Sequence, residues 1–90
     1  MSRRLIVRPE AEADITDAAM WYDSREPALG LELISEVQAA IARAIKNPDS
    51  FTRVRLNPIV RRVLTRRFPY RVFFIVRPNA IVERAQRLKT

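Results

Sequence analysis

Arginine dominates the charged side chains of the second half of this sequence and defines the chemistry that the chain could perform. Five arginines lie within eleven residues, on both sides of a short proline-containing turn: Arg61, Arg62, Arg66, Arg67 and Arg71. A planar guanidinium group donates paired hydrogen bonds whose geometry matches a phosphate or a carboxylate. The cluster is therefore suited to bind an anion, which could be nucleic acid or an acidic protein segment.

Groups that could transfer a proton are scarce beside these arginines. The sequence has no histidine and no cysteine, so the commonest metal ligand, thiolate ligands and disulfides are all excluded. After Asp49, only Glu83 carries a side-chain carboxylate and only Tyr70 carries a phenol. Glu83 is most simply a surface charge on a strand, and Tyr70 most simply a core residue. Because RNA cleavage needs a general base and a general acid, the sequence favours binding over catalysis, and we expect no catalytic residue, cofactor or metal.

The charge of the chain is unevenly distributed. The 90 residues have a formal net charge of +7. Residues 1–51 contain six basic and nine acidic side chains, whereas residues 52–90 contain eleven basic side chains and one acid. The hydrophobic fraction of 48% and the lack of a long apolar run predict one small globular domain over residues 1–90, without a membrane span. The start does not resemble a secretory signal, so we expect a cytoplasmic protein.

A strand and two amphipathic helices are predicted in the first half. Arg4–Arg8 is short, apolar at its centre and followed by a proline, which indicates a strand. Apolar residues recur at helical spacing between Glu10 and Glu26, with acids early, where the helix dipole favours them. An apolar i, i+4 ridge then runs from Leu29 to Ile45. The two helices should form an antiparallel hairpin whose apolar faces need a sheet to cover them.

The hydrophobic period changes to two after a proline-containing loop. Val60–Arg67 and Tyr70–Arg77 flank a short turn and predict a β-hairpin, and Ala80–Leu88 predicts a last strand. The order β-α-α-β-β-β predicts an α+β fold, with the helical hairpin on one face of a mostly antiparallel sheet and arginines on the other face. Periodicity does not determine where the first strand lies in this sheet.

Several segments of the sequence resemble, in order, the ParE/RelE toxins of type II toxin–antitoxin systems. They are A-x-x-D-I-x-x-A-x-x-W-Y from Ala11 to Tyr22, I-K-N-P from Ile45 to Pro48, V-R-R from Val60 to Arg62, R-F-P-Y-R-V-F-F from Arg67 to Phe74, and I-V-E-R-A from Ile81 to Ala85. The set covers nearly the whole chain and is most similar to the ParE-like, or plasmid-stabilisation, branch. The resemblance implies a toxin that a cognate antitoxin wraps and neutralises, and the pair commonly represses its own operon. Contact with operator DNA would then be indirect, through the antitoxin.

The two branches of this superfamily differ in what the free toxin does. RelE-like members cut messenger RNA on the ribosome, whereas ParE-like members are associated with inhibition of DNA gyrase. RelE-like nucleases resemble one another in carrying a tyrosine or histidine near the C-terminus, and residues 87–90 of this chain contain neither. The ParE-like activity is therefore expected. A RelE-like endonuclease and an inactive toxin-fold protein that only binds antitoxin stay open as alternatives.

The arginine cluster is the expected contact with the antitoxin, which could be ParD-like or of another family. We expect an acidic stretch of antitoxin to pair with the guanidinium groups and to cover exposed apolar residues such as Phe73 and Ile75. The predicted contact residues are Arg61, Arg62, Arg67, Arg71 and Phe73. A simpler interpretation is a solvated hairpin face that protects a sheet edge from aggregation. Direct binding of nucleic acid is less favoured, because no row of aromatic residues suited to base stacking is present.

Overall fold

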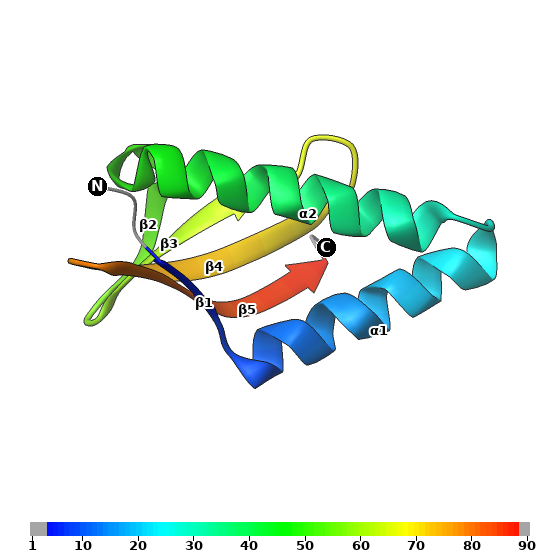
Figure 1. Ribbon diagram of the computed structural model, residues 1–90, viewed down its shortest axis with the longest axis horizontal. Coiled ribbons are helices and arrows are strands. Elements are labelled where there is room, and N and C mark those ends of the chain that lie inside the picture. Colours follow the sequence, from blue (N-terminus) through cyan, green and yellow to red (C-terminus); the bar gives the residue numbers. More distant parts are fainter. Residues whose placement is uncertain (1–3, 89–90) are drawn as a thin grey trace.

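The structure, a computed structural model, describes residues 4–88 of the chain, with side chains described as far as Arg84. Its elements are β1 (Arg4–Val7), α1 (Pro9–Arg25), α2 (Leu29–Lys46), a short 3₁₀ helix η1 (Pro48–Ser50), β2 (Thr52–Leu56), β3 (Ile59–Leu64), β4 (Tyr70–Arg77) and β5 (Ala80–Leu88). The two helices form a hairpin beside the sheet (Figure 1). The predicted α+β class is confirmed. In the described residues, neither helix is both long and apolar enough to cross a membrane.

The strands of residues 4–88 form one mixed sheet of five strands, in the order β1-β5-β4-β3-β2. Strands β2 to β5 pair as an antiparallel meander, and β1 pairs parallel to β5 at one edge. This settles the position of the first strand, which periodicity left open. A parallel neighbour is possible for β1 because the helical hairpin carries the chain back across the sheet before the meander begins.

Strand β2 is absent from the sequence prediction, which assigned its residues to a loop. The segment Thr52–Leu56 alternates arginine with apolar residues, but it is short and lies exposed along its whole length at the edge of the sheet. It pairs antiparallel with β3, with Leu56 opposite Ile59 across a turn that contains Pro58. An exposed edge strand has no buried face, so its hydrophobic pattern is weak.

The contact between α1 and α2 depends on small residues. The buried positions of α1 are Ala11, Ala18 and Ala19. Gly30, at the start of α2, donates its backbone N–H to Asp23 Oδ1 over 2.7 Å. A Cβ atom at position 30 would lie 2.5 Å from the carbonyl oxygen of Ala19. The one glycine of the sequence is therefore required by the close approach of the two helices.

The core lies between the helical hairpin and one face of the sheet. Leu33 and Val37 of α2 pack with Val63 of β3 and with Val72 and Phe74 of β4. These strand residues alternate with others that point to the opposite face, as predicted. The face of the sheet that packs against the helices is called the helix face, and the opposite one is called the second face.

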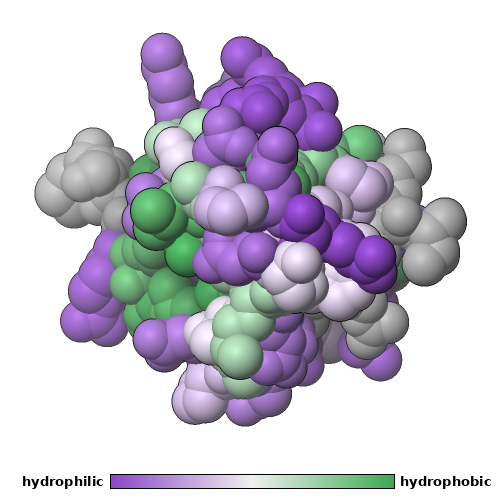
Figure 2. Space-filling view, turned by 90° about the vertical axis from the view of Figure 1, so that its right-hand side faces the viewer, coloured by the Kyte–Doolittle hydropathy of each residue, from purple (hydrophilic) through white to green (hydrophobic). Residues whose placement is uncertain are grey.

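The adjacent aromatic residues of α1 have different surroundings. The Tyr22 ring packs edge-on against Phe68, with 5.0 Å between the ring centroids. The Trp21 side chain stays 46% exposed, and the Arg25 guanidinium lies 4.4 Å from the centroid of its ring. Tyr22 thus belongs to the core, whereas Trp21 lies at the surface. Figure 2, which views the right-hand end of Figure 1, shows mostly hydrophilic surface, with apolar surface gathered on one side.

Candidate functional site

The second face brings together three of the predicted contact residues. Arg62 of β3 lies directly opposite Phe73 of β4, and Leu64 lies opposite Arg71 in the next pair on this face. Arg62, Arg71 and Phe73 are all partly exposed. The hairpin register therefore places two guanidinium groups beside an accessible aromatic ring. We call this group of three residues the arginine face.

The arginines of this face have unused hydrogen-bond donors. Within residues 4–84, the Arg62 side chain makes no hydrogen bond or ion pair. The Nε atom of Arg71 is buried and has no acceptor in the same part of the chain. The Arg62 side chain is partly exposed, so its guanidinium donors are available to an incoming anion. The arginine face can therefore donate hydrogen bonds to the oxygen atoms of an anionic ligand.

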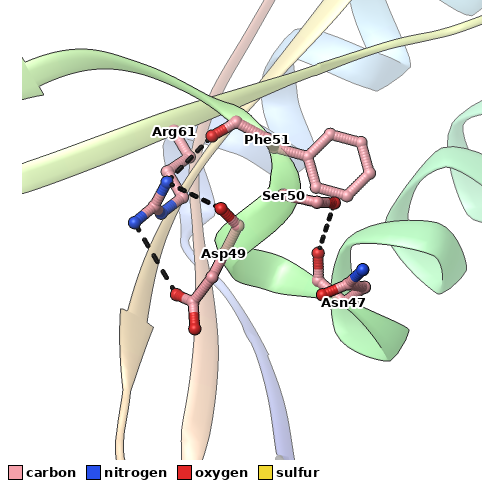
Figure 3. Close-up of polar contacts among 5 residues, drawn as sticks. All are labelled: Asn47, Asp49, Ser50, Phe51 and Arg61. Carbon is pink, nitrogen blue, oxygen red and sulfur yellow. Dashed lines mark hydrogen bonds and ion pairs between the residues drawn. The ribbon is translucent and has the colours of Figure 1, made fainter.

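Arg61 is held by the chain itself and does not belong to the arginine face. It lies opposite Phe74, on the helix face, and its side chain is only 15% exposed. Its Nη1 donates to the carbonyl oxygens of Phe51 at 2.9 Å and Asp49 at 3.3 Å, and its Nη2 lies 3.6 Å from Asp49 Oδ1 (Figure 3). These contacts fix the passage from η1 into β2. Arg61 therefore has a structural role at the edge of the sheet.

Arg67 lies in the loop between β3 and β4, apart from both other sites. Its Nη1 lies 3.5 Å from Glu32 Oε1 of α2, and its guanidinium lies 5.7 Å from the centroid of the Phe68 ring. The side chain is mostly exposed. The five clustered arginines of the sequence are thus divided among the arginine face, the start of β2 and this loop.

Ile75 is not the exposed residue that the sequence predicted. Its exposed fraction is 5%, although it points to the second face. Its cross-strand partner on β5 is Val82, and the buried Val60 of β3 lies on the same face. The central position of β4 between two apolar neighbours accounts for this burial. A ligand bound to this face could contact Phe73 but could not cover Ile75 without displacing its neighbours.

Glu83 is buried, and its interpretation as a surface charge on a strand is wrong. Glu83 pairs with Phe74 on the helix face, and its exposed fraction is 2%. Its Oε1 has no hydrogen-bond partner among the described residues. Burial raises the pKa of the carboxyl group from 4.5 to about 7. The signal was present in the sequence, because Glu83 follows the core residue Ile81 by two positions and so shares its face.

Tyr70 is a core residue, as predicted. It is buried on the helix face at the start of β4. Its burial, followed by the charges of Asp14, Glu83 and Asp17, raises the pKa of its hydroxyl above the usual value for tyrosine. Neither Tyr70 nor Glu83 lies on the arginine face, so neither could transfer a proton to a ligand bound there. In the described residues no group of acidic side chains is arranged to hold a metal ion.

No family model and no curated protein matches the sequence. A chain of a solved structure described as "Chromosomal ParDE TA system from P. aeruginosa" has a similar fold, with a TM-score of 0.84 and 18% sequence identity. The match covers 99% of this chain and 98% of that chain. The fold expected from the resemblance to the ParE/RelE toxins is therefore confirmed.

Proposed function

We propose that the chain is the toxin of a type II toxin–antitoxin system, neutralised in the cytoplasm by a cognate antitoxin that is ParD-like or of another family. The observation that carries the proposal is the likeness of nearly the whole chain to a chain of a ParDE system. The ordered segments that resemble ParE-like toxins support it independently, because they come from the sequence and not from the fold.

The arginine face is the proposed contact with an acidic segment of the antitoxin. Arg62 and Arg71 supply unused donors, and Phe73 supplies apolar area beside them. Arg67 in the nearby loop could exchange its contact with Glu32 for one with the partner, because an exposed ion pair contributes little to stability. Arg61 would act indirectly, by holding β2 in place.

The proposed target of the free toxin is DNA gyrase. A ribonuclease would need a general base and a general acid beside the arginines that bind the phosphate. The described carboxylate and phenol of the basic half, Glu83 and Tyr70, are buried on the opposite face of the sheet. A toxin that acts by binding needs no such groups, and this favours the ParE-like activity.

Induction of the chain alone in a bacterium, with and without the neighbouring open reading frame, tests this function. We expect growth arrest with DNA breaks and intact transcripts, and recovery when the neighbouring frame is expressed. Cuts in messenger RNA at fixed positions within codons would contradict the gyrase proposal and would indicate a RelE-like endonuclease. Tight binding of the neighbouring product without any effect of the chain on growth would indicate an inactive toxin fold.

A charge-reversal experiment tests the contact surface. Reversing Arg62 and Arg71 together to glutamate should weaken antitoxin binding strongly and make the affinity less sensitive to salt, because screening acts on charge pairs. Reversing Arg53 and Arg55 of the exposed β2 edge is the matched control, because it changes the net charge equally. Equal weakening by the two double variants would contradict a specific contact at the arginine face.

A further inference from the structure

A cavity of about 280 Å³ opens at the edge of the sheet, where β2 begins beside β3 and the end of α2. Its lining includes Arg43 of α2, Thr52 of β2 and Arg62 of β3. Thr52 and Arg62 are direct cross-strand partners. Arg43 reaches the sheet by donating from Nη2 to the carbonyl oxygen of Leu64 over 2.7 Å. Three elements thus contribute two arginines and a threonine to the lining of one cavity.

The charge of this cavity is not balanced. None of the described residues that line it is acidic. A guanidinium group has five N–H donors, and the bond to Leu64 uses one donor of Arg43. The side chain of Arg62 makes no hydrogen bond or ion pair within residues 4–84. The lining therefore includes two positively charged residues and no described acidic one, which suits the cavity to an anion.

The neighbouring loop between β3 and β4 also carries arginines, but two carboxylates of α2 already contact this loop. The backbone N–H groups of Arg66 and Arg67 both donate to Glu36 Oε1, over 3.2 and 3.4 Å. Arg67 also contacts Glu32. These two carboxylates of α2 would repel the phosphate backbone of a nucleic acid that ran from the cavity along the loop. The arrangement favours one carboxylate in the cavity over a continuous nucleic-acid track.

We propose that the cavity formed by Arg43, Thr52 and Arg62 binds one Asp or Glu side chain of the antitoxin's acidic segment. The inference rests on the proposed function and adds Arg43 and Thr52 to its contact residues. Arg62 belongs both to this cavity and to the arginine face. An antitoxin segment bound along that face would therefore place an acidic side chain in the cavity at the edge of the sheet. The exposed side chain of Leu64, at the rim, offers apolar contact to the residue next to the acid.

A titration with small anions tests the cavity separately from the antitoxin. An acetylated tetraglutamate amide is added to the isotope-labelled chain, and the backbone amide signals are followed by NMR. We expect saturable shifts at Ser50, Thr52 and Leu64, and an affinity at least about tenfold lower for the variant Arg43→Gln/Arg62→Gln, since charge-assisted hydrogen bonds are lost. The variant Arg53→Gln/Arg55→Gln should bind like the wild type. Equal loss in both variants, or tighter binding of inorganic phosphate than of the peptide, would overturn the proposal.

The same variants are then titrated with the product of the neighbouring open reading frame. We expect at least about a tenfold loss of affinity for Arg43→Gln/Arg62→Gln and none for Arg53→Gln/Arg55→Gln. Equal affinities for all three chains, with growth still protected, would refute the cavity but leave the proposed function intact. Absence of binding to the wild type, with no effect of the chain on growth, would instead refute the proposed function. Circular dichroism of each variant establishes that it is folded.

Discussion

The buried carboxyl group of Glu83 should make the stability of the chain depend on pH in an unusual direction. Its pKa is raised from 4.5 to about 7 in the folded chain, so the folded chain holds this proton more tightly than the unfolded chain does. The contribution of Glu83 to stability is therefore fully present below about pH 4.5, falls as the pH rises, and is lost above about pH 7. Paired surface carboxylates have the opposite effect.

The size of this effect follows from the two pKa values. One pKa unit corresponds to about 1.4 kcal/mol, so a rise from 4.5 to about 7 corresponds to up to roughly 3 kcal/mol. Small domains are stable by only about 5–15 kcal/mol, which makes this a large fraction of the total. Glu83→Gln keeps the shape of the protonated side chain and removes its ionisation. The variant should be more stable than the wild type by roughly 1 kcal/mol at pH 5 and by up to roughly 3 kcal/mol at pH 8.

Urea unfolding at pH 5 and pH 8, at constant ionic strength, measures the difference. Glu26→Gln is the matched control, because Glu26 is an exposed acid after the end of α1 and outside its first turn. Its unfolding free energy should follow that of the wild type at both pH values. The reasoning is refuted if Glu83→Gln lowers stability by the same amount at pH 5 and pH 8, because the carboxylate would then be contributing favourable interactions in its ionised form.

Three further substitutions test the packing that positions the site. Gly30→Ala should destabilise the chain by about 1–3 kcal/mol, because the added Cβ atom would meet the Ala19 carbonyl at 2.5 Å and force the helices apart; an unchanged Tm would contradict this close approach. Arg61→Gln should cost about 1–2 kcal/mol through its lost hydrogen bonds to backbone carbonyls, whereas Asp49→Asn should cost less than about 1 kcal/mol because the Asp49 side chain is mostly exposed. Chemical unfolding compares this pair, and equal costs would show that the ion pair, not the backbone contacts, fixes the start of β2.

The sequence predicted the elements that have a buried face and missed the one that has none. Helix α2 and strand β4 each pack one apolar face into the core, so the hydrophobic periodicity of the sequence predicted both elements. Strand β2 is exposed along its whole length, and its alternation of arginine with apolar residues is too short to predict a strand. The place of β1 beside β5 depends on how the whole chain is connected, which local periodicity does not encode.

The sequence could predict a cluster of arginines but not how the fold divides it. Five arginines close in the sequence became three separate groups, because neighbouring residues on a strand point to opposite faces. Arg61 turned inward to Phe51, while Arg62 stayed on the second face. Arg43 could not be predicted at all, since it comes from a helix distant in the sequence and reaches Leu64 only in the folded chain.

The most direct test of the proposed toxin activity is to add the purified chain to a DNA gyrase supercoiling reaction, with and without the purified product of the neighbouring open reading frame. The proposal predicts that the chain alone inhibits supercoiling or traps cleaved DNA, and that the neighbouring product restores the reaction at a stoichiometric amount. Unimpaired supercoiling at a large excess of the chain, together with cleavage of messenger RNA in a translation reaction, would contradict it.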